Sequence, residues 1–164
     1  MRRALAIAGS ALFLVIAPGT VAGLVPSWIS QWRFESGVLD SSALRIAGGA
    51  LAAAGLFVLL ASFADFALKG LGTPAPVFPT HHLVVAGFYR YVRNPMYVAV
   101  VSLIVGQALI FASVRLLGYA AVVWLCFHLF VLAYEEPMLR AKYGEEYERF
   151  RAEVPRWIPR KSGN

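Results

Sequence analysis

Four long apolar segments constrain this chain more than any other feature of its sequence. They cover residues 4–29, 44–66, 96–114 and 116–134, and none holds more than two formally charged side chains. At about 1.5 Å per residue, each of the last two would reach about 28 Å, close to the thickness of a bilayer's hydrocarbon core. The sequence therefore predicts an all-α integral membrane protein with about four transmembrane helices, in which residues 1–164 form one membrane domain.

The composition supports a membrane protein over a soluble one. Hydrophobic residues make up 59% of the chain and the mean hydropathy is +0.65, which is more apolar surface than a soluble domain of 164 residues could bury. The net charge of +6 is scattered over loops and the tail, which favours a membrane surface over nucleic acid as the partner. Cys126 is the single cysteine, so no disulfide framework is possible within the chain.

The distribution of basic residues predicts an orientation. If the N-terminus, residues 67–94 and the C-terminal tail share one side, that side holds twelve of the 15 lysines and arginines, and the other side holds three. The positive-inside rule then places both termini in the cytoplasm and requires an even number of spans. Size and short loops suggest a bacterial inner membrane. The first segment, preceded by Arg2 and Arg3, also resembles a secretory signal peptide, and that alternative stays open.

Local features predict how the helices bend and pack. Pro18 and Gly19 should kink the first segment. The last two segments are separated only by Arg115, which predicts a tight antiparallel hairpin. Gln107 and His128 are expected to make interhelical hydrogen bonds. The second segment has a face of small residues that should let another helix approach closely, formed by Gly48, Gly49, Ala52, Ala53, Ala54 and Gly55.

The junction before the third segment is the most specific local signal. Asn94 is a favoured N-cap residue and Pro95 is favoured at the first helical position, so the helix should begin there. A helix start presents free N–H groups and a partial positive charge, and Arg93 lies beside it. We therefore expect this point to bind a carboxylate or a phosphate.

Two adjacent acids, Glu135 and Glu136, follow the fourth segment, and Pro137 behind them predicts a break or a restart of the helix. A tight hairpin of the last two segments would return these acids to the same membrane face as Arg93. An acidic and a basic group together suit a ligand with both charges, such as S-adenosylmethionine or a zwitterionic phospholipid headgroup. Glu135 could also accept hydrogen bonds from ribose hydroxyls.

The tail after Pro137 predicts an amphipathic helix that lies at the interface or caps the hairpin. Its apolar and aromatic residues recur every three or four positions, at Leu139, Tyr143, Tyr147, Phe150 and Val154. No spacing of cysteine and histidine suggests a metal site.

From residue 81 to 159 the chain resembles the isoprenylcysteine carboxyl methyltransferase and phospholipid methyltransferase family of integral membrane enzymes. The matching residues occur in the family's order: His81, Leu83-Val84, Gly87, Tyr89, Arg93-Asn94-Pro95-Met96-Tyr97, Glu135-Glu136, Leu139, Tyr143-Gly144-Glu145-Glu146-Tyr147, Val154-Pro155 and Pro159. The resemblance implies S-adenosylmethionine as cofactor. It also implies a set of cofactor contacts, namely His81, His82, Leu83, Val84, Tyr89, Asn94, Pro95, Met96, Tyr97 and Glu135.

Two positions depart from the family pattern. Asn94 stands where the family usually has histidine, and it can donate and accept hydrogen bonds but cannot titrate. Val131 stands where the eukaryotic prenylcysteine enzymes have an arginine, which argues against a prenylcysteine carboxylate as acceptor.

The resemblance implies methyl transfer to a lipophilic, isoprenoid-like or lipid acceptor at the cytoplasmic face. Arg93 and Glu136 are the candidate catalytic residues, with Glu136 as a base if the acceptor is an ammonium group. Phospholipid N-methylation is the second interpretation. A noncatalytic membrane scaffold or binding protein is the third.

Overall fold

The structure is a computed structural model that describes residues 2–65, 83 and 85–159. It is all-helical over these ranges, as predicted. The longer elements are α1 (Arg2–Gly19), α2 (Val25–Ser30), α3 (Ser42–Asp65), α4 (Pro95–Ile110), α5 (Val114–Phe130), α6 (Glu136–Tyr143) and α7 (Glu145–Glu153). The described residues also hold two π-helical turns, η1 (Thr20–Leu24) and η4 (Val131–Glu135), and a 3-10 turn, η3 (Gly87–Arg90).

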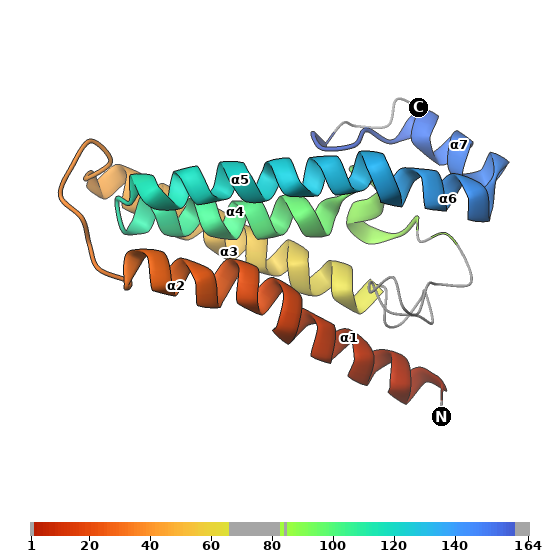
Figure 1. Ribbon diagram of the computed structural model, residues 1–164, viewed down its shortest axis with the longest axis horizontal. Helices are drawn as coiled ribbons and strands as arrows, with labels where there is room; N and C mark the ends of the chain where they lie inside the picture. Colours follow the sequence, from red (N-terminus) through yellow and green to blue (C-terminus); the bar gives the residue numbers. More distant parts are fainter. Residues whose placement is uncertain (1, 66–82, 84, 160–164) are drawn as a thin grey trace.

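Within the described residues, three helical stretches are long and apolar enough to cross a membrane, Ala11–Ser30, Ser42–Asp65 and Val114–Tyr143, and α4 is a shorter apolar helix of 16 residues. In Figure 1 the start of α1, the end of α3, the start of α4 and the α6–α7 segment lie at one end of the molecule. The loop from α2 to α3 and the turn from α4 to α5 lie at the other end. The candidate site residues described below belong to the first of these ends.

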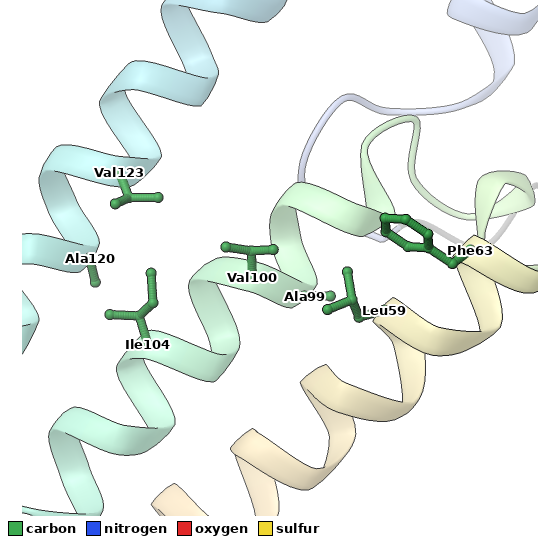
Figure 2. Packing of buried hydrophobic residues seen from close by; sticks show 7 residues of the cluster. All are labelled: Leu59, Phe63, Ala99, Val100, Ile104, Ala120 and Val123. Atoms are coloured by element: carbon green, nitrogen blue, oxygen red, sulfur yellow. The ribbon is translucent and has the colours of Figure 1, made fainter. Parts of the chain in front are cut away.

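The core lies where α4 passes between α3 and α5 (Figure 2). Its buried side chains come from these three helices: Leu59, Phe63, Ala99, Val100, Ile104, Ala120 and Val123. Ile104 is fully buried at the centre of α4. Because α4 is held on two sides, its first turn, which carries the predicted anion site, has a fixed position.

Small residues form the seam between α3 and α4. A Cβ atom placed on Gly48 would lie 2.6 Å from the carbonyl oxygen of Gly106, and one on Gly106 would lie 2.7 Å from the carbonyl oxygen of Gly48. Gly55 approaches the backbone of Ala99 in the same way. The predicted packing face is therefore confirmed at Gly48 and Gly55, whereas Gly49 has open space around it.

The first apolar segment bends at its π turn, and neighbouring helices compensate for the bonds it loses (Figure 1). Pro26 has no N–H, so it can donate to neither Val21 nor Ala22 one turn before it. Gln107 of α4 donates to the Ala22 carbonyl at 2.7 Å, and Tyr119 of α5 donates to the Val21 carbonyl at 2.9 Å. The predicted interhelical bond of Gln107 is thus confirmed, and its partner is backbone, as bilayer-spanning helices with proline require.

One predicted helix end is wrong, and a second is right in only one of its two alternatives. The hairpin does not turn at Arg115: α4 ends at Ile110, and the turn passes through Ala112, whose φ of +55° lies in the left-handed region. At Pro137 the chain does not break, because it is helical from Val114 to Tyr143, but α6 restarts there with Pro137 in its first turn, as the other predicted alternative has it. The helix continues because η4 shifts the hydrogen bonding, with the Glu136 N–H donating to the Val131 carbonyl five residues back.

The amphipathic tail forms two short helices instead of one. The break is at Gly144, whose φ of +53° suits glycine, between α6 and α7. The predicted apolar face nevertheless packs as one cluster: Tyr147, Phe150 and Val154 are buried, and Leu83, Leu139 and Tyr143 pack against them.

Candidate active site

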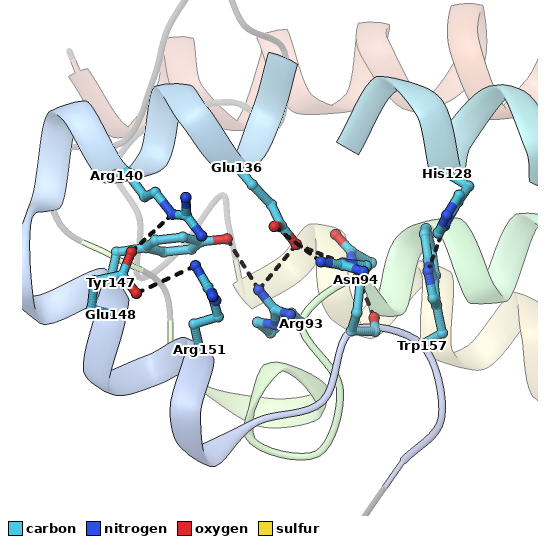
Figure 3. A network of polar contacts seen from close by, with 10 residues as sticks. Arg93, Asn94, His128, Glu136, Arg140, Tyr147, Glu148, Arg151 and Trp157 are labelled. Atoms are coloured by element: carbon cyan, nitrogen blue, oxygen red, sulfur yellow. Dashed lines mark hydrogen bonds and ion pairs between the residues drawn. The ribbon is translucent and has the colours of Figure 1, made fainter. Parts of the chain in front are cut away.

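The acidic doublet after η4 meets the start of α4, as the hairpin argument predicted. Arg93 donates from Nη1 to Oε1 of Glu136 at 3.1 Å and to the hydroxyl oxygen of Tyr147 at 3.2 Å (Figure 3). The Arg93 and Glu136 side chains are each only 9% exposed. This ion pair therefore joins the segment before α4 to the first residue of α6 in a place with little water.

Glu135, the other acid of the doublet, makes a separate contact with the start of α4. The Tyr97 hydroxyl donates to Oε2 of Glu135 at 2.8 Å, and the Tyr97 ring packs on Phe127 with centroids 4.6 Å apart. A π-helical turn changes the angular spacing of the residues that follow it, and such turns occur often at functional sites. Here the turn ends at Glu135, and both adjacent acids face the beginning of α4.

The C-terminal segment after α7 runs back over this helix start and is bonded to it. The Arg93 N–H donates to the Pro155 carbonyl at 2.9 Å, and Nδ2 of Asn94 donates to the Arg156 carbonyl at 3.1 Å. The Arg156 guanidinium binds Glu136 through two bonds, Nε to Oε1 at 2.6 Å and Nη2 to Oε2 at 3.1 Å. Trp157 donates from Nε1 to Nδ1 of His128 at 3.1 Å, so the expected partner of His128 lies on the tail and not on another helix.

Asn94 occupies the predicted N-cap position and Pro95 the first helical position, but Asn94 does not cap the helix. Its side-chain amide donates to the Arg156 carbonyl instead, and it makes no capping hydrogen bond at the start of α4. The first-turn N–H groups of α4 therefore have no side-chain acceptor from Asn94. An N-terminus of this kind, beside a buried arginine, is suited to an anionic group.

The predicted cofactor residues divide into three groups. Asn94, Pro95, Tyr97 and Glu135 lie together at the helix start, and Met96 beside them packs on the core. Leu83 is placed on the tail cluster of Tyr147, Phe150 and Val154. His81, His82 and Val84 lie outside the described residues.

Tyr89 is the remaining predicted cofactor contact, and it is buried in η3 at 8% exposure. Burial raises the pKa of the Tyr89 hydroxyl well above its usual value, and the charge of Glu135 raises it further. Tyr89 therefore stays neutral near this acid. Among the described residues, no group of three or more side chains is arranged to hold a metal ion.

Sequence reasoning missed Arg156 and the polar role of Tyr147. Tyr147 was predicted only as a packing residue, and it is fully buried, but its hydroxyl also accepts from Arg93. Arg156 follows Val154 and Pro155, which belong to the family-like pattern, and its spacing of 20 residues from Glu136 gives no periodic signal. Its place directly after Val154 and Pro155 was the available clue.

A groove of about 420 Å³ lies beside α7, and Leu83, one of the predicted cofactor contacts, is part of its lining. Its lining residues are Leu83, Val85, Glu145, Glu146, Arg149, Phe150 and Glu153. Arg149 pairs with Glu145 on its rim, and both side chains are highly exposed.

Comparison of the chain with known proteins identifies its family. Over 80 residues the chain is 35% identical to a protein-S-isoprenylcysteine O-methyltransferase of Schizosaccharomyces pombe, a match that covers 48% of this chain and 34% of that protein. The chain thus spans about a third of the length of that relative. No solved structure gave a significant match. The model of the phospholipid methyltransferase family matches residues 44–146, and the chain belongs to this family.

Proposed function

We propose that this protein transfers a methyl group from S-adenosylmethionine to a lipophilic acceptor at the cytoplasmic face of a membrane. Members of its family are membrane methyltransferases that use this donor. The observation that carries the proposal is the meeting of Glu135 and Glu136 with Tyr97 and Arg93 at one end of the bundle. These contacts assemble acidic and basic groups for a ligand that carries both charges.

The residues present fit this cofactor. Nε of Arg93 is buried and has no hydrogen-bond partner among the described residues, so the guanidinium keeps a donor for a carboxylate. In our proposal Arg93 and the first turn of α4 hold the carboxylate of the amino-acid part. Glu135 accepts hydrogen bonds from the ribose hydroxyls. The other proposed contacts are His81, His82, Leu83, Val84, Tyr89, Asn94, Pro95, Met96 and Tyr97.

The bound donor would supply a methyl group already activated on a sulfonium, so the chain's contribution is to position the reactants and exclude water. Glu136 accepts bonds from two arginines, and abstracting a proton would require it to give up part of that pairing. The bonds favour a positioning role for Glu136 over its predicted role as a base. An acceptor that needs no base, such as a carboxylate or a thiolate, is compatible with this positioning role.

The orientation supports a cytoplasmic site. Arg90 in η3, Arg93 just before α4 and Arg156, which is bonded to Glu136 of α6, belong to the end of the bundle at which α1 starts (Figure 1). Arg33, Arg45 and Arg115 belong to the opposite end. By the positive-inside rule, we propose that both termini and the site face the cytoplasm, and a bacterial inner membrane fits a chain of this size.

The acceptor would be isoprenoid-like or lipid-like and could enter sideways from the bilayer. Val131 is 1% exposed, so this position offers packing and no charge to an acceptor carboxylate. Phospholipid N-methylation is a second candidate, which the match to the phospholipid methyltransferase family favours. It would need a group that removes a proton from the ammonium.

Methyl transfer to membrane lipids tests the proposal directly. Purified protein in detergent is incubated with methyl-labelled S-adenosylmethionine and a lipid extract, and the labelled products are separated. A labelled methyl ester or thioether supports an isoprenoid-like acceptor, and a labelled methylated headgroup amine supports the second candidate. Glu135→Ala should abolish labelling, and Glu146→Gln, an exposed acid on α7, should not. Absence of labelling and of saturable cofactor binding would instead favour a noncatalytic scaffold.

A further inference from the structure

Glu136 is shared unequally between two arginines. Arg156 contacts both of its carboxylate oxygens, at 2.6 and 3.1 Å, whereas Arg93 contacts one of them, at 3.1 Å. A two-bond arginine–carboxylate pair is stronger and better oriented than a single bond. Arg156 is therefore the main partner of this carboxylate.

The three charges leave the cluster with one net positive charge. Arg93 and Arg156 each contribute one positive charge, and Glu136 contributes one negative charge. If Arg156 were neutral, Arg93 and Glu136 alone would form a neutral pair. The net charge at the start of α4 thus depends on a residue from the C-terminal segment.

Two neighbouring groups leave this charge in place, and the adjacent acid Glu135 accepts a hydrogen bond from Tyr97. Burial and the charge of Glu136 raise the pKa of the Tyr147 hydroxyl, so Tyr147 accepts from Arg93 as a neutral group. Arg140 approaches from α6, but it pairs with Glu148 at 2.8 Å (Figure 3). The excess charge resides on Arg93, whose Nε keeps an unused donor among the described residues.

We propose that Arg156 is a positioning residue that occupies the Glu136 carboxylate and so frees the positive charge of Arg93 for the carboxylate of the bound cofactor. The inference rests on the proposed function, since it concerns the same site. Arg156 therefore strengthens binding of the amino-acid part of the cofactor and contributes little to binding of the adenosine part.

Two probes separate these contributions. S-adenosylhomocysteine carries the amino-acid carboxylate, and methylthioadenosine lacks it. We expect Arg156→Gln to weaken binding of S-adenosylhomocysteine about tenfold to a hundredfold, the range for a lost charge-assisted contact, and to change methylthioadenosine binding less than about threefold. Arg156→Lys keeps the charge but loses the two-nitrogen geometry of the guanidinium. Its affinity for S-adenosylhomocysteine should lie between those of the parent and Arg156→Gln. Arg149→Gln, which removes an exposed arginine from α7, is the matched control and should bind both probes as the parent does.

A charge-compensating variant gives the decisive comparison. Glu136→Gln combined with Arg156→Gln removes one charge of each sign and again leaves Arg93 without an anionic partner. This double variant should therefore bind S-adenosylhomocysteine more tightly than Arg156→Gln alone. If it binds no better, or if Arg156→Gln weakens both probes equally, the inference is overturned. Parent protein that binds neither probe would instead overturn the proposed function itself.

Discussion

Gly106→Ala should destabilise the helix bundle, although alanine is normally a better helix former than glycine. The added Cβ atom would lie 2.7 Å from the Gly48 carbonyl oxygen and 2.8 Å from both the nitrogen and the Cβ of Ala52. None of these atoms belongs to a flexible side chain that could turn away. The helices α3 and α4 would have to move apart along the seam, which also supports the start of α4.

The cost follows from these distances. Overpacking of this kind costs about 1–3 kcal/mol, and the helix propensity of alanine offsets about 1 kcal/mol of it. We expect a net loss of about 1–2 kcal/mol, or a fall of about 2–8 °C in the midpoint of thermal unfolding in detergent. Gly49→Ala is the matched control, because nothing lies within 4 Å of its Cβ position, and it should be neutral or stabilising. Equal midpoints of thermal unfolding for the two variants would contradict the close packing of α3 against α4 at Gly106.

Three further outcomes are expected. Gln107→Leu removes the donor to the first helix and should lower the unfolding free energy by about 1 kcal/mol, measured by denaturation in detergent. The hydrogen bond from Arg115 lowers the pKa of Glu35, so its stabilising contribution is present above its unfolded pKa and is lost as the pH falls through the folded value. Arg115→Gln should move the Glu35 pKa upward in a carboxyl NMR titration, and an unchanged pKa would contradict the pairing. Burial, and then the charge of Glu136, raise the pKa of Tyr147, so Glu136→Gln should lower its midpoint in an alkaline absorbance titration, with Tyr147→Phe identifying the signal.

The helical architecture was predictable because it depends on local composition. The apolar segments and the helix start at Pro95 are read directly from residue types and spacing. The ends of the helices were harder to predict from the sequence. The turn at Ala112 uses a left-handed backbone conformation in an apolar residue, and nothing in the sequence distinguishes that alanine from its helical neighbours. The continuation through Pro137 depends on the π turn η4, which has no residue signature of its own.

Only the part of the site that follows from the helical hairpin could be predicted from the sequence. Arg93 and Glu136 could be brought together because two antiparallel helices joined by a short turn return the chain to the same level. Arg156 and Trp157 could not be placed, because their positions depend on how the tail folds back after α7. The same tertiary contact explains why Asn94 does not cap its helix, since its amide is bonded to Arg156 instead.

A crystal structure with S-adenosylhomocysteine bound tests the central claim most directly. We expect the ligand carboxylate within hydrogen-bond distance of Arg93 and the ribose within reach of Glu135. A ligand in the groove beside α7 without contact to Arg93 or Glu135, or at the end of the bundle that carries Arg115, would contradict the assignment of the cofactor to the beginning of α4.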